Sequence, residues 1–374
     1  MKEEVSIYLD ALRLSAALAV LAEHSSDYIG GWIWRFASFG AEAVAVFFVL
    51  SGFVIAHVCA QRENSASKYA GARALRMYSV VIPAVLFTLL FDSIGQHLNA
   101  AVYQASPYTA PSLLVYLRSL TFTHQLWHTD IHFGSNGPFW SLGFEVAYYV
   151  IFGVAFFVTN KLYRAVGVLL LLLLCGPRIV AYLPLWLMGV GTYSMLYGRW
   201  NGALKSFSRI PPIAWCLLLL ATVIAFLLVH RFGHATNSYL KIYRRFELTP
   251  AVFGTLAYFY LLGTIVAVHI VTFAFAAQSN WLAAIVASVR KPIRWLAGGT
   301  FTIYLLNLPV LLCLKAVFFG WDGGEVKLTL VMTLTIAICL LCAELSERRK
   351  SNMKHWFAKL FGARTPQVAP NVAP

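Results

Sequence analysis

The sequence predicts an all-α integral membrane protein with about ten transmembrane helices. Of its 374 residues, 60% are hydrophobic and only 12% are charged, whereas soluble domains contain about 45–50% apolar residues. The mean hydropathy is +0.71. No polar stretch is long and patterned enough to form a soluble domain, so we expect the function to reside in the membrane body.

The number of membrane spans follows from the length of the apolar runs, because a crossing helix needs about 20 apolar residues. Ten segments qualify, near residues 8–24, 40–60, 78–95, 141–159, 165–177, 181–198, 212–230, 250–276, 297–319 and 326–344. The fifth is short and is separated from the sixth only by Gly176, Pro177 and Arg178. Residues 165–198 therefore cross either twice or as one broken re-entrant pair. The first run lacks a small-residue cleavage site and contains charges, so it stays as the first span.

The Lys and Arg residues predict the orientation. They gather in alternate connections and in the C-terminal segment, and cytoplasmic loops carry such an excess, which predicts that both termini are cytoplasmic. The basic loop that contains Arg231, Lys241, Arg244 and Arg245 is the exception, and the pattern gives no account of it. We divide the chain into a membrane domain, 1–345, and a basic, partly disordered cytoplasmic tail, 346–374. Within the tail, KHWFAKLF is either an amphipathic helix on the inner leaflet or a solvated segment.

Composition also excludes some classes of function. The net charge is +14, but the basic residues lie mostly in short loops, so topology accounts for them and we expect no nucleic-acid partner. The six cysteines lie in or beside apolar runs without disulfide or metal-ligand spacing, which is typical of small core residues. No internal repeat is evident, and this weakens the case for a transporter.

The first span carries ionisable residues at both of its ends. Arg13 and His24 are eleven residues apart, so they lie on nearly one helix face, roughly 16 Å apart along the axis. Ionisable side chains are costly inside a membrane, and several together indicate a polar path through the bundle. Asp10 is placed to pair with Arg13. In the alternative interpretation, Arg13 extends to the interface and His24 is a polar residue at a helix end.

Two further motifs carry charge into the membrane. In GPFWSLGFEVAYY, the spacing puts Ser141, Glu145 and Tyr148 on one helix face, and Glu145 is either functional or a structural carboxylate with a buried basic partner. In ARALR, Arg73 and Arg76 form a fork of planar donors that suits phosphate, although positive-inside charge alone also explains them.

Two other motifs are weaker. The loop THQLWHTDIH offers His124, His128, Asp130 and His132, but no Cys or Glu completes a familiar site, so we expect no metal. Ser51 in FFVLSGF lacks the strand–turn–helix context of a nucleophile elbow. Together with Gly52 it is more typical of close helix packing.

Several motifs in order resemble the acyltransferase-three family of bacterial membrane acyltransferases, which commonly O-acetylate sugars of surface and secreted polysaccharides. YLDALRLSAALAVLAEH resembles the family's opening signature, an Arg, ten residues and then a His. AVFFVLSGFVI, the ARALR pair, GPFWSLGFEVAYY and FTIYLLNLP resemble later blocks. The resemblance covers most of the chain.

The resemblance implies a ten-helix enzyme of the bacterial cytoplasmic (inner) membrane that takes an acyl group from cytoplasmic acyl-CoA, with acetyl-CoA favoured. The acceptor would be a carbohydrate or lipid-linked sugar at or beyond the membrane. His24 would be the catalytic histidine, and Glu145 the acidic residue of the fourth span. Arg13, Arg73 and Arg76 would bind the donor. Trp140 and Ser141, in the same block as Glu145, are candidate contacts for the acceptor.

The chain departs from the family where members often have a second histidine, because Asn307 stands there. In the mechanism that these positions suggest, the arginines hold the donor's phosphates at the inner side and the thioester meets His24 further out. His24 acts either as general base or as a covalent acyl acceptor. The alternative is a carrier or flippase for a glycolipid or small anion that uses Arg13, His24 and Glu145 as its path. A polysaccharide polymerase would need a larger, Arg-rich outer loop, whereas residues 96–139 contain only Arg118.

Overall fold

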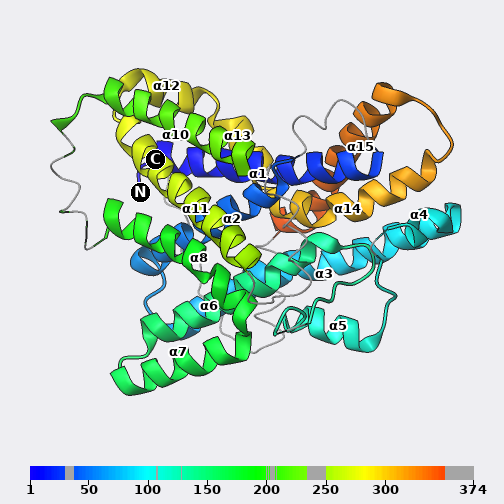
Figure 1. Cartoon of the computed structure of the whole chain (residues 1–374), viewed down its shortest axis with the longest axis horizontal. Helices are drawn as coiled ribbons and strands as arrows, with labels where there is room; N and C mark the ends of the chain where they lie inside the picture. Colours follow the sequence, from blue (N-terminus) through cyan, green and yellow to red (C-terminus); the bar gives the residue numbers. More distant parts are fainter. Residues whose placement is uncertain are drawn as a thin grey trace, which may run out of the picture.

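The computed structural model describes residues 1–29, 38–106, 108–127, 129–198, 209–233 and 250–349, with isolated positions between 200 and 207. Within these ranges the chain forms helices and loops and no strand. The helices are α1 (Glu3–Ile29), α2 (Gly40–Gln61), α3 (Ala66–Leu98), α4 (Ala100–Gln104), α5 (Leu113–Leu120), η2 (Gly137–Phe139), α6 (Trp140–Phe157), α7 (Lys161–Cys175), α8 (Pro177–Leu196), α10 (Pro212–Gly233), α11 (Pro250–Ala276), α12 (Asn280–Ser288), α13 (Arg290–Ala297), α14 (Thr300–Val317), α15 (Gly324–Leu345) and η5 (Glu347–Arg349) (Figure 1).

Every one of the ten predicted spans coincides with a helix, which confirms the all-α membrane fold. Nine of the described helices are long and apolar enough to cross a membrane. The remaining one, α7, has only 15 residues and is about 22 Å long, shorter than the hydrocarbon core of about 30 Å. The largest difference in bounds is at α3, which begins at Ala66 rather than near residue 78, so Arg73 and Arg76 lie on a continuous helix.

The short helix α7 nevertheless connects the two ends of the bundle. It follows α6, whose last residue, Phe157, packs against Tyr69 at the beginning of α3. At its other end, the Cys175 carbonyl accepts a hydrogen bond from the Trp127 N–H, in the loop that follows α5. Gly176 then separates α7 from α8 with a φ of 83°, and a side chain there would meet the Trp127 backbone. Residues 165–198 therefore form two helices that run between opposite ends of the bundle.

The beginning of α1 and the end of α15 lie at the same end of the bundle. Glu3 and Asp10 of α1 form ion pairs with Arg290 and Arg294 of α13. Arg348, just beyond α15, hydrogen-bonds the carbonyl of Trp295 in α13. We call this the basic end. It holds the beginning of α1, helices α12 and α13, the beginning of α14 and the end of α15.

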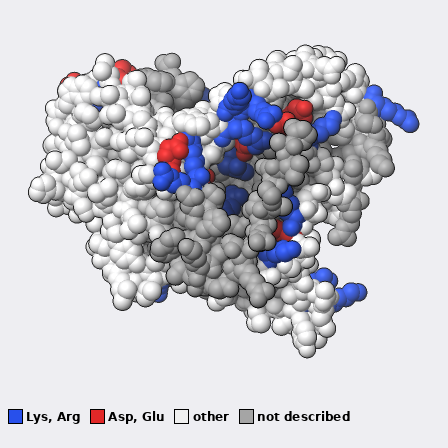
Figure 2. Space-filling model, turned by 180° about the vertical axis from the view of Figure 1, so that it is seen from behind, with Lys and Arg blue, Asp and Glu red and all other residues white. Residues whose placement is uncertain are grey.

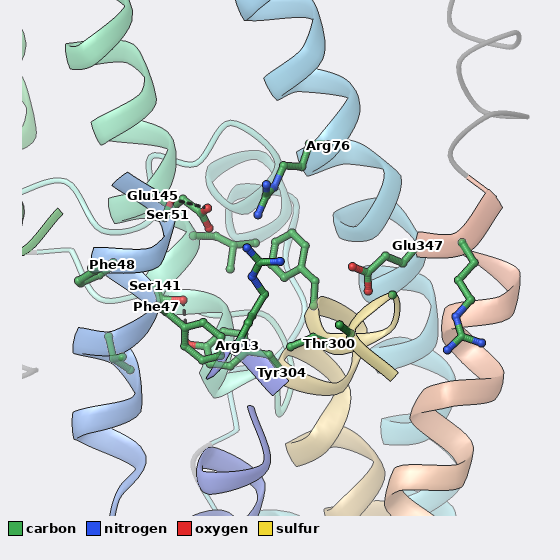
Figure 3. A pocket seen from close by; sticks show the side chains of 16 residues that line it. Arg13, Phe47, Phe48, Ser51, Arg76, Ser141, Glu145, Thr300, Tyr304 and Glu347 are labelled. Carbon is green, nitrogen blue, oxygen red and sulfur yellow. Dashed lines mark hydrogen bonds between the residues drawn. The ribbon is translucent and has the colours of Figure 1, made fainter. Parts of the chain in front are cut away.

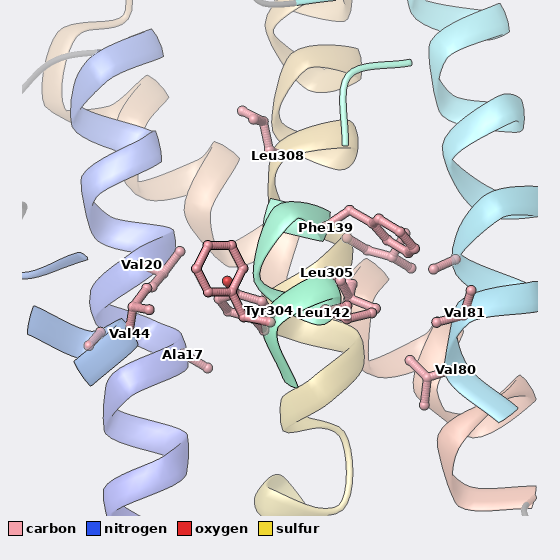
Figure 4. Packing of buried hydrophobic residues seen from close by; sticks show 14 of the residues in the cluster. Ala17, Val20, Val44, Val80, Val81, Phe139, Leu142, Tyr304, Leu305 and Leu308 are labelled. Carbon is pink, nitrogen blue, oxygen red and sulfur yellow. The ribbon is translucent and has the colours of Figure 1, made fainter. Parts of the chain in front are cut away.

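Helix α14 lies at the centre of the molecule. Its residues from Thr302 to Leu314 are all buried, and it packs against α1, α3 and α15. Figure 4 shows this layer, where Ala17 and Val20 of α1, Leu305 and Leu308 of α14, and Phe139 of η2 meet around Tyr304. A helix that is apolar on all sides is stable only when it is surrounded in this way, here by other helices.

Helices α2 and α8 cross in close contact because glycines face each other. A Cβ atom on Gly52 would lie 1.9 Å from the Trp186 carbonyl oxygen, and one on Gly189 would lie 1.9 Å from that of Val49. Small residues permit this approach of two backbones inside a membrane. The interpretation of Gly52 as a packing residue is therefore confirmed. Of the six cysteines, all but Cys216 are buried and none forms a disulfide.

The loop between α5 and η2 closes the end of the bundle opposite the basic end. Arg178 of α8 is buried, and it donates to the Gln125 side chain and to the Thr129 carbonyl. Asp92 of α3 accepts hydrogen bonds from the backbone and hydroxyl of Ser135. Buried charges are stable only when they are paired and hydrogen-bonded, so these contacts fix the loop on the helices.

Candidate active site

A cavity of about 380 Å³ opens among α1, α2, α3, α6 and α14 near the basic end. Its charged lining residues are Arg13, Arg76, Glu145, Glu347 and Arg348. Ser51, Ser141, Thr300 and Tyr304 add hydroxyl groups, and Phe47 and Phe48 add aromatic walls. This is the mixture that a small-molecule site requires, with apolar walls and a few converging polar groups.

Two arginines define the electrostatics of the cavity. The guanidinium groups of Arg13 and Arg76 turn toward one another in its middle, with Glu145 and Glu347 on either side (Figure 3). On the face seen in Figure 2, basic side chains gather around and inside a hollow. The predicted pairing of Arg13 with Asp10 is present, at 3.2 Å, but Asp10 also pairs with Arg294. Two planar guanidinium groups directed into one space present the donor geometry that suits an anion such as phosphate.

Glu145 is held on the wall of the cavity by hydroxyl groups. Its Oε1 accepts hydrogen bonds from Ser51, at 3.1 Å, and from Tyr149, one turn further along α6. Trp186 Nε1 in turn donates to Ser51 Oγ at 3.2 Å. The tyrosine of α6 that supports Glu145 is therefore Tyr149. Tyr148 is fully buried and donates to the Ile179 carbonyl of α8, so it does not line the cavity with Ser141 and Glu145.

Arg73 does not join Arg76 in a common fork. Its Nη2 lies 2.7 Å from Glu63 Oε1, in the connection between α2 and α3. Its guanidinium group lies over the rings of Tyr69 and Tyr149, 5.6 and 5.8 Å from their centres, and it does not line the cavity. Because Arg73 and Arg76 are three residues apart on α3, their side chains have different neighbours. The carboxylate of Glu63 binds the guanidinium group of Arg73.

His24 is oriented by Asn307 of α14, the position where the family often has histidine. The two side chains meet at 2.6 Å, between His24 Nδ1 and Asn307 Oδ1. Asn307 Nδ2 donates to the Tyr304 carbonyl at 2.8 Å, and a carbonyl can only accept. The amide oxygen of Asn307 must therefore accept the proton on His24 Nδ1, so Nε2 is the unprotonated nitrogen of the neutral ring.

His24 lies beyond the cavity and does not line it. Tyr304, which does, donates to Ser141 Oγ at 2.8 Å and precedes Asn307 by three residues on α14. The His24–Asn307 pair is thus about one helical turn further from the basic end than the cavity. Ala17 and Val20 fill the intervening stretch of α1 (Figure 4). The structure brings Arg13, Arg76, Ser141 and Glu145 into one cavity. His24 lies beyond the end of this cavity that is farther from the basic end.

The comparison with known proteins agrees with the motifs. The family model for the acyltransferase domain matches residues 6–344. The chain belongs to the acyltransferase-three family. All the predicted site residues lie inside the matched range.

The chain is also similar in sequence to three known proteins. An O-acetyl transferase of Shigella phage Sf6 is 32% identical over 155 residues, which are 39% of this chain and 44% of the relative. Nodulation protein 10 of Rhizobium leguminosarum bv. viciae is 23% identical over 53% of this chain and 61% of its own. An acyltransferase of Streptomyces mycarofaciens is 28% identical over 165 residues, which are 41% of this chain and 40% of the relative. The chain thus spans about half the length of these relatives. No solved structure matches.

Two lining residues come from the segment that the sequence assigned to the tail. Glu347 in η5 accepts hydrogen bonds from the backbone and hydroxyl of Thr302, at 3.0 and 3.1 Å. Arg348 lies 4.3 Å over the ring of Trp295. Residues 347–349 therefore fold back on the beginning of α14 and form part of the cavity. The only sequence signal was one acidic residue in a basic run, SERRK, directly after the last span. Residues 350–374 of the tail, with KHWFAKLF, and residues 234–249 of the basic loop lie outside the described residues.

Trp140 and Ser141 are placed differently. Ser141 is buried in the cavity wall, where it accepts from Tyr304. Trp140 is half-buried at the beginning of α6, with its ring edge-on to Phe144 at 5.1 Å, and does not line the cavity. Across the described residues, which include His124, Asp130 and His132 but not His128, no group of three metal-ligating side chains occurs.

Proposed function

We propose that this family member is a membrane acyltransferase that moves a short acyl group, acetyl foremost, from cytoplasmic acyl-CoA to a hydroxyl of a glycan or lipid-linked sugar. The observation that carries the proposal is a depth order along α1. Arg13 stands with Arg76 in the cavity at the basic end, and His24, with Nε2 unprotonated, stands one turn beyond that cavity. An anion-binding group and a base at two depths suit a donor with a phosphate end and a reactive end.

The donor would enter from the basic end. This end concentrates Lys and Arg in its connections, so we assign it to the cytoplasm of the bacterial inner membrane. Arg13 and Arg76 would bind the phosphates of acyl-CoA through paired N–H donors. Its extended arm would follow α1 past Ala17 toward His24, a distance of roughly 16 Å. Glu145 lies within electrostatic reach of both arginines, so it would balance their charge when no phosphate is bound.

The chemistry would take place at His24. Its Nε2 removes the proton from the acceptor hydroxyl as the oxygen bonds to the thioester carbonyl carbon. The carbon–sulfur bond then breaks, and the leaving sulfur takes that proton from Nε2. In the covalent variant, Nε2 itself first takes the acyl group and passes it to the acceptor. Asn307 holds the ring in the tautomer that either route needs. Ser141, which is hydrogen-bonded to Tyr304, and Trp140 would contact the acceptor.

The nature of the acyl group and the acceptor rests on the relatives. One is named an O-acetyl transferase and another an acyltransferase, and the family resemblance adds sugars as the common acceptors. Oxygen acceptors and a short acyl group follow from these names by similarity. No feature of the described cavity calls for a metal ion.

The test uses membranes that contain the full-length protein, with labelled acetyl-CoA, and follows the label into free acetate, protein, lipid and polysaccharide. We expect transfer by the wild type, none by His24→Ala, and normal transfer by His97→Ala, an exposed histidine at the end of α3. Equal transfer by wild type and His24→Ala would refute the role of His24. A wild type that moves a glycolipid across the membrane without acyl-CoA would favour the carrier.

A further inference from the structure

A second group of polar side chains lies at the end of the bundle opposite the basic end, between α2, α10 and α11. It consists of Ser38, Glu42, His230 and Tyr258. His230 Nδ1 lies 2.8 Å from Glu42 Oε1, and its Nε2 lies 3.1 Å from Ser38 Oγ. Tyr258 also donates to Glu42 Oε1. Glu42 is 0% exposed and His230 8% exposed, whereas Ser38 is partly exposed.

The polarity of these hydrogen bonds is fixed by chemistry. A carboxylate can only accept, so His230 Nδ1 carries the proton that points to Glu42. In the neutral ring, His230 Nε2 then accepts a hydrogen bond from the Ser38 hydroxyl. The order is a hydroxyl, a base and a carboxylate that orients the base, at the distances that activate a nucleophile. Phe39 stacks on His230 at 3.7 Å and fixes the plane of the ring.

Packing alone does not explain why these residues are polar. A buried carboxylate is costly unless it is paired and hydrogen-bonded, and apolar residues of similar volume often replace a buried ion pair without loss of stability. Among the residues that the structure describes, Glu42 Oε2 has no hydrogen-bond partner, so within this group the carboxylate is only partly satisfied. Retention of a costly, incompletely paired carboxylate beside a histidine is typical of functional sites.

An apolar cavity of about 260 Å³ adjoins this group. Phe39 belongs to both, because it lines the cavity and also stacks on His230. The other walls come from four helices, including Ala16 and Ala19 of α1, Phe226 of α10 and Val266 of α11. Phe226 and His230 are four residues apart, so they share one face of α10. Apart from Ser15, Thr222 and His269 the lining side chains are apolar, so the cavity suits a hydrocarbon chain.

We propose that Ser38 is a second acyl-accepting nucleophile, specific for an ester or thioester with an apolar acyl chain. The chain would lie in the cavity below Phe39. As Ser38 Oγ forms a bond to the acyl carbon, its proton passes to His230 Nε2. The bond to the leaving oxygen or sulfur then breaks, and the leaving group takes that proton from His230. This site lies on the other side of α1 from the cavity of Arg13 and needs neither His24 nor acyl-CoA bound there.

The experiment uses an alkyl fluorophosphonate, which forms a covalent bond with activated serines, on the full-length protein in membranes. We expect label on Ser38, located by peptide mass spectrometry, and faster labelling by a dodecyl probe than by an ethyl probe. Ser38→Ala should remove the label. Glu42→Gln, which keeps the size of the side chain, should slow labelling at least tenfold.

Two variants serve as controls. Ser26→Ala, a partly exposed serine near the same end of α1, should leave labelling unchanged. His24→Ala should also leave it unchanged, so failure of the proposed acyl transfer and failure of this inference give different results. Each variant must elute as the wild type does in size-exclusion chromatography. An unlabelled Ser38 in the folded wild type, or equal labelling of the wild type and Glu42→Gln, would overturn the proposal.

Discussion

Arg73 and Arg76 look equivalent in the sequence, but the structure gives them different neighbours. Arg76 lines the cavity, and Arg73 is paired with Glu63. We predict that Arg76→Ala raises the KM for acetyl-CoA by roughly 10–100-fold, because a charged hydrogen bond contributes about 1.5–3 kcal/mol. Arg73→Ala should change KM less than about threefold and should lower thermal stability, because buried Glu63 loses its partner. Initial rates against acetyl-CoA concentration decide between them, and equal effects on KM would restore the common fork.

Asn307 is the residue whose role changed most between sequence and structure. The sequence only excluded a second base at this position, whereas the structure makes it the hydrogen-bond partner of His24. Asn307→Ala should lower kcat by about 10–100-fold and leave KM for acetyl-CoA nearly unchanged, because it acts on the ring and not on the donor. A variant that raises KM and preserves kcat would show that Asn307 contributes to binding instead. Asn160→Ala, at the beginning of α7, is the control.

His124 makes the loop between α5 and η2 sensitive to acid. Burial lowers the pKa of this histidine to about 4, against an ordinary value of 6.5, although hydrogen bonds to backbone carbonyls oppose the shift. The unfolded chain therefore binds the additional proton between pH 6.5 and 4, and stability falls as the pH falls through this window. The total loss is about 3 kcal/mol at 1.36 kcal/mol per pH unit.

The measurement compares the thermal midpoint of the wild type at pH 7 and pH 5 with that of His124→Gln, which has no titrating ring. We expect a smaller decrease for the variant. If both proteins lose the same stability between the two pH values, another group is responsible for the acid sensitivity.

At the scale of the helices, the crossing of α2 and α8 depends on two glycines with no room for a side chain. A Cβ on Gly189 would meet the Val49 carbonyl oxygen, and that atom belongs to a rigid helix. Gly189→Ala must push the helices apart, and overpacking of this kind costs about 1–3 kcal/mol or more.

Gly191, two residues along the same helix, has no atom within 4 Å of its would-be Cβ. Gly191→Ala should therefore stabilise the protein slightly, by about 0.5–1 kcal/mol, since alanine favours a helix over glycine. Thermal midpoints of both variants in the same detergent provide the measurement. Equal midpoints would mean that α2 and α8 are not in the close contact described.

Helix α7 shows that contacts with neighbouring segments decide whether a short apolar run crosses the membrane. Its 15 residues are fewer than the roughly 20 that a crossing helix needs. The sequence therefore did not decide whether residues 165–198 cross the membrane once or twice. The contact between Cys175 and Trp127 places the end of α7 beside the loop between α5 and η2, opposite the basic end. A helix of this length crosses where its neighbours, α6 and α8, cover part of its surface and the bilayer adapts to the mismatch.

At the scale of the whole molecule, the beginning of α1 and the end of α15 lie at the same end of the bundle. From the positive-inside rule we predict that this end is cytoplasmic. Fusions of green fluorescent protein before Met1 and after Arg349 should fluoresce, and alkaline phosphatase inserted near Thr121, in the loop after α5, should be active. Phosphatase activity from a fusion at either end of the chain would reverse the orientation and, with it, the proposed route of acyl-CoA.

The sequence by itself determined the order of the helices and the position of nearly every span, because spans depend on local runs of apolar residues that need no partner to be recognised. It also identified the family and most of the charged positions. Tertiary structure alone decided which of these positions meet. Arg76 rather than Arg73 faces Arg13, Tyr149 rather than Tyr148 supports Glu145, and Glu347 returns to close the cavity. Helix periodicity fixes the direction of a side chain only relative to its own axis, whereas the rotation of each helix about that axis is set by packing between residues far apart in the chain, such as Gly52 with Trp186.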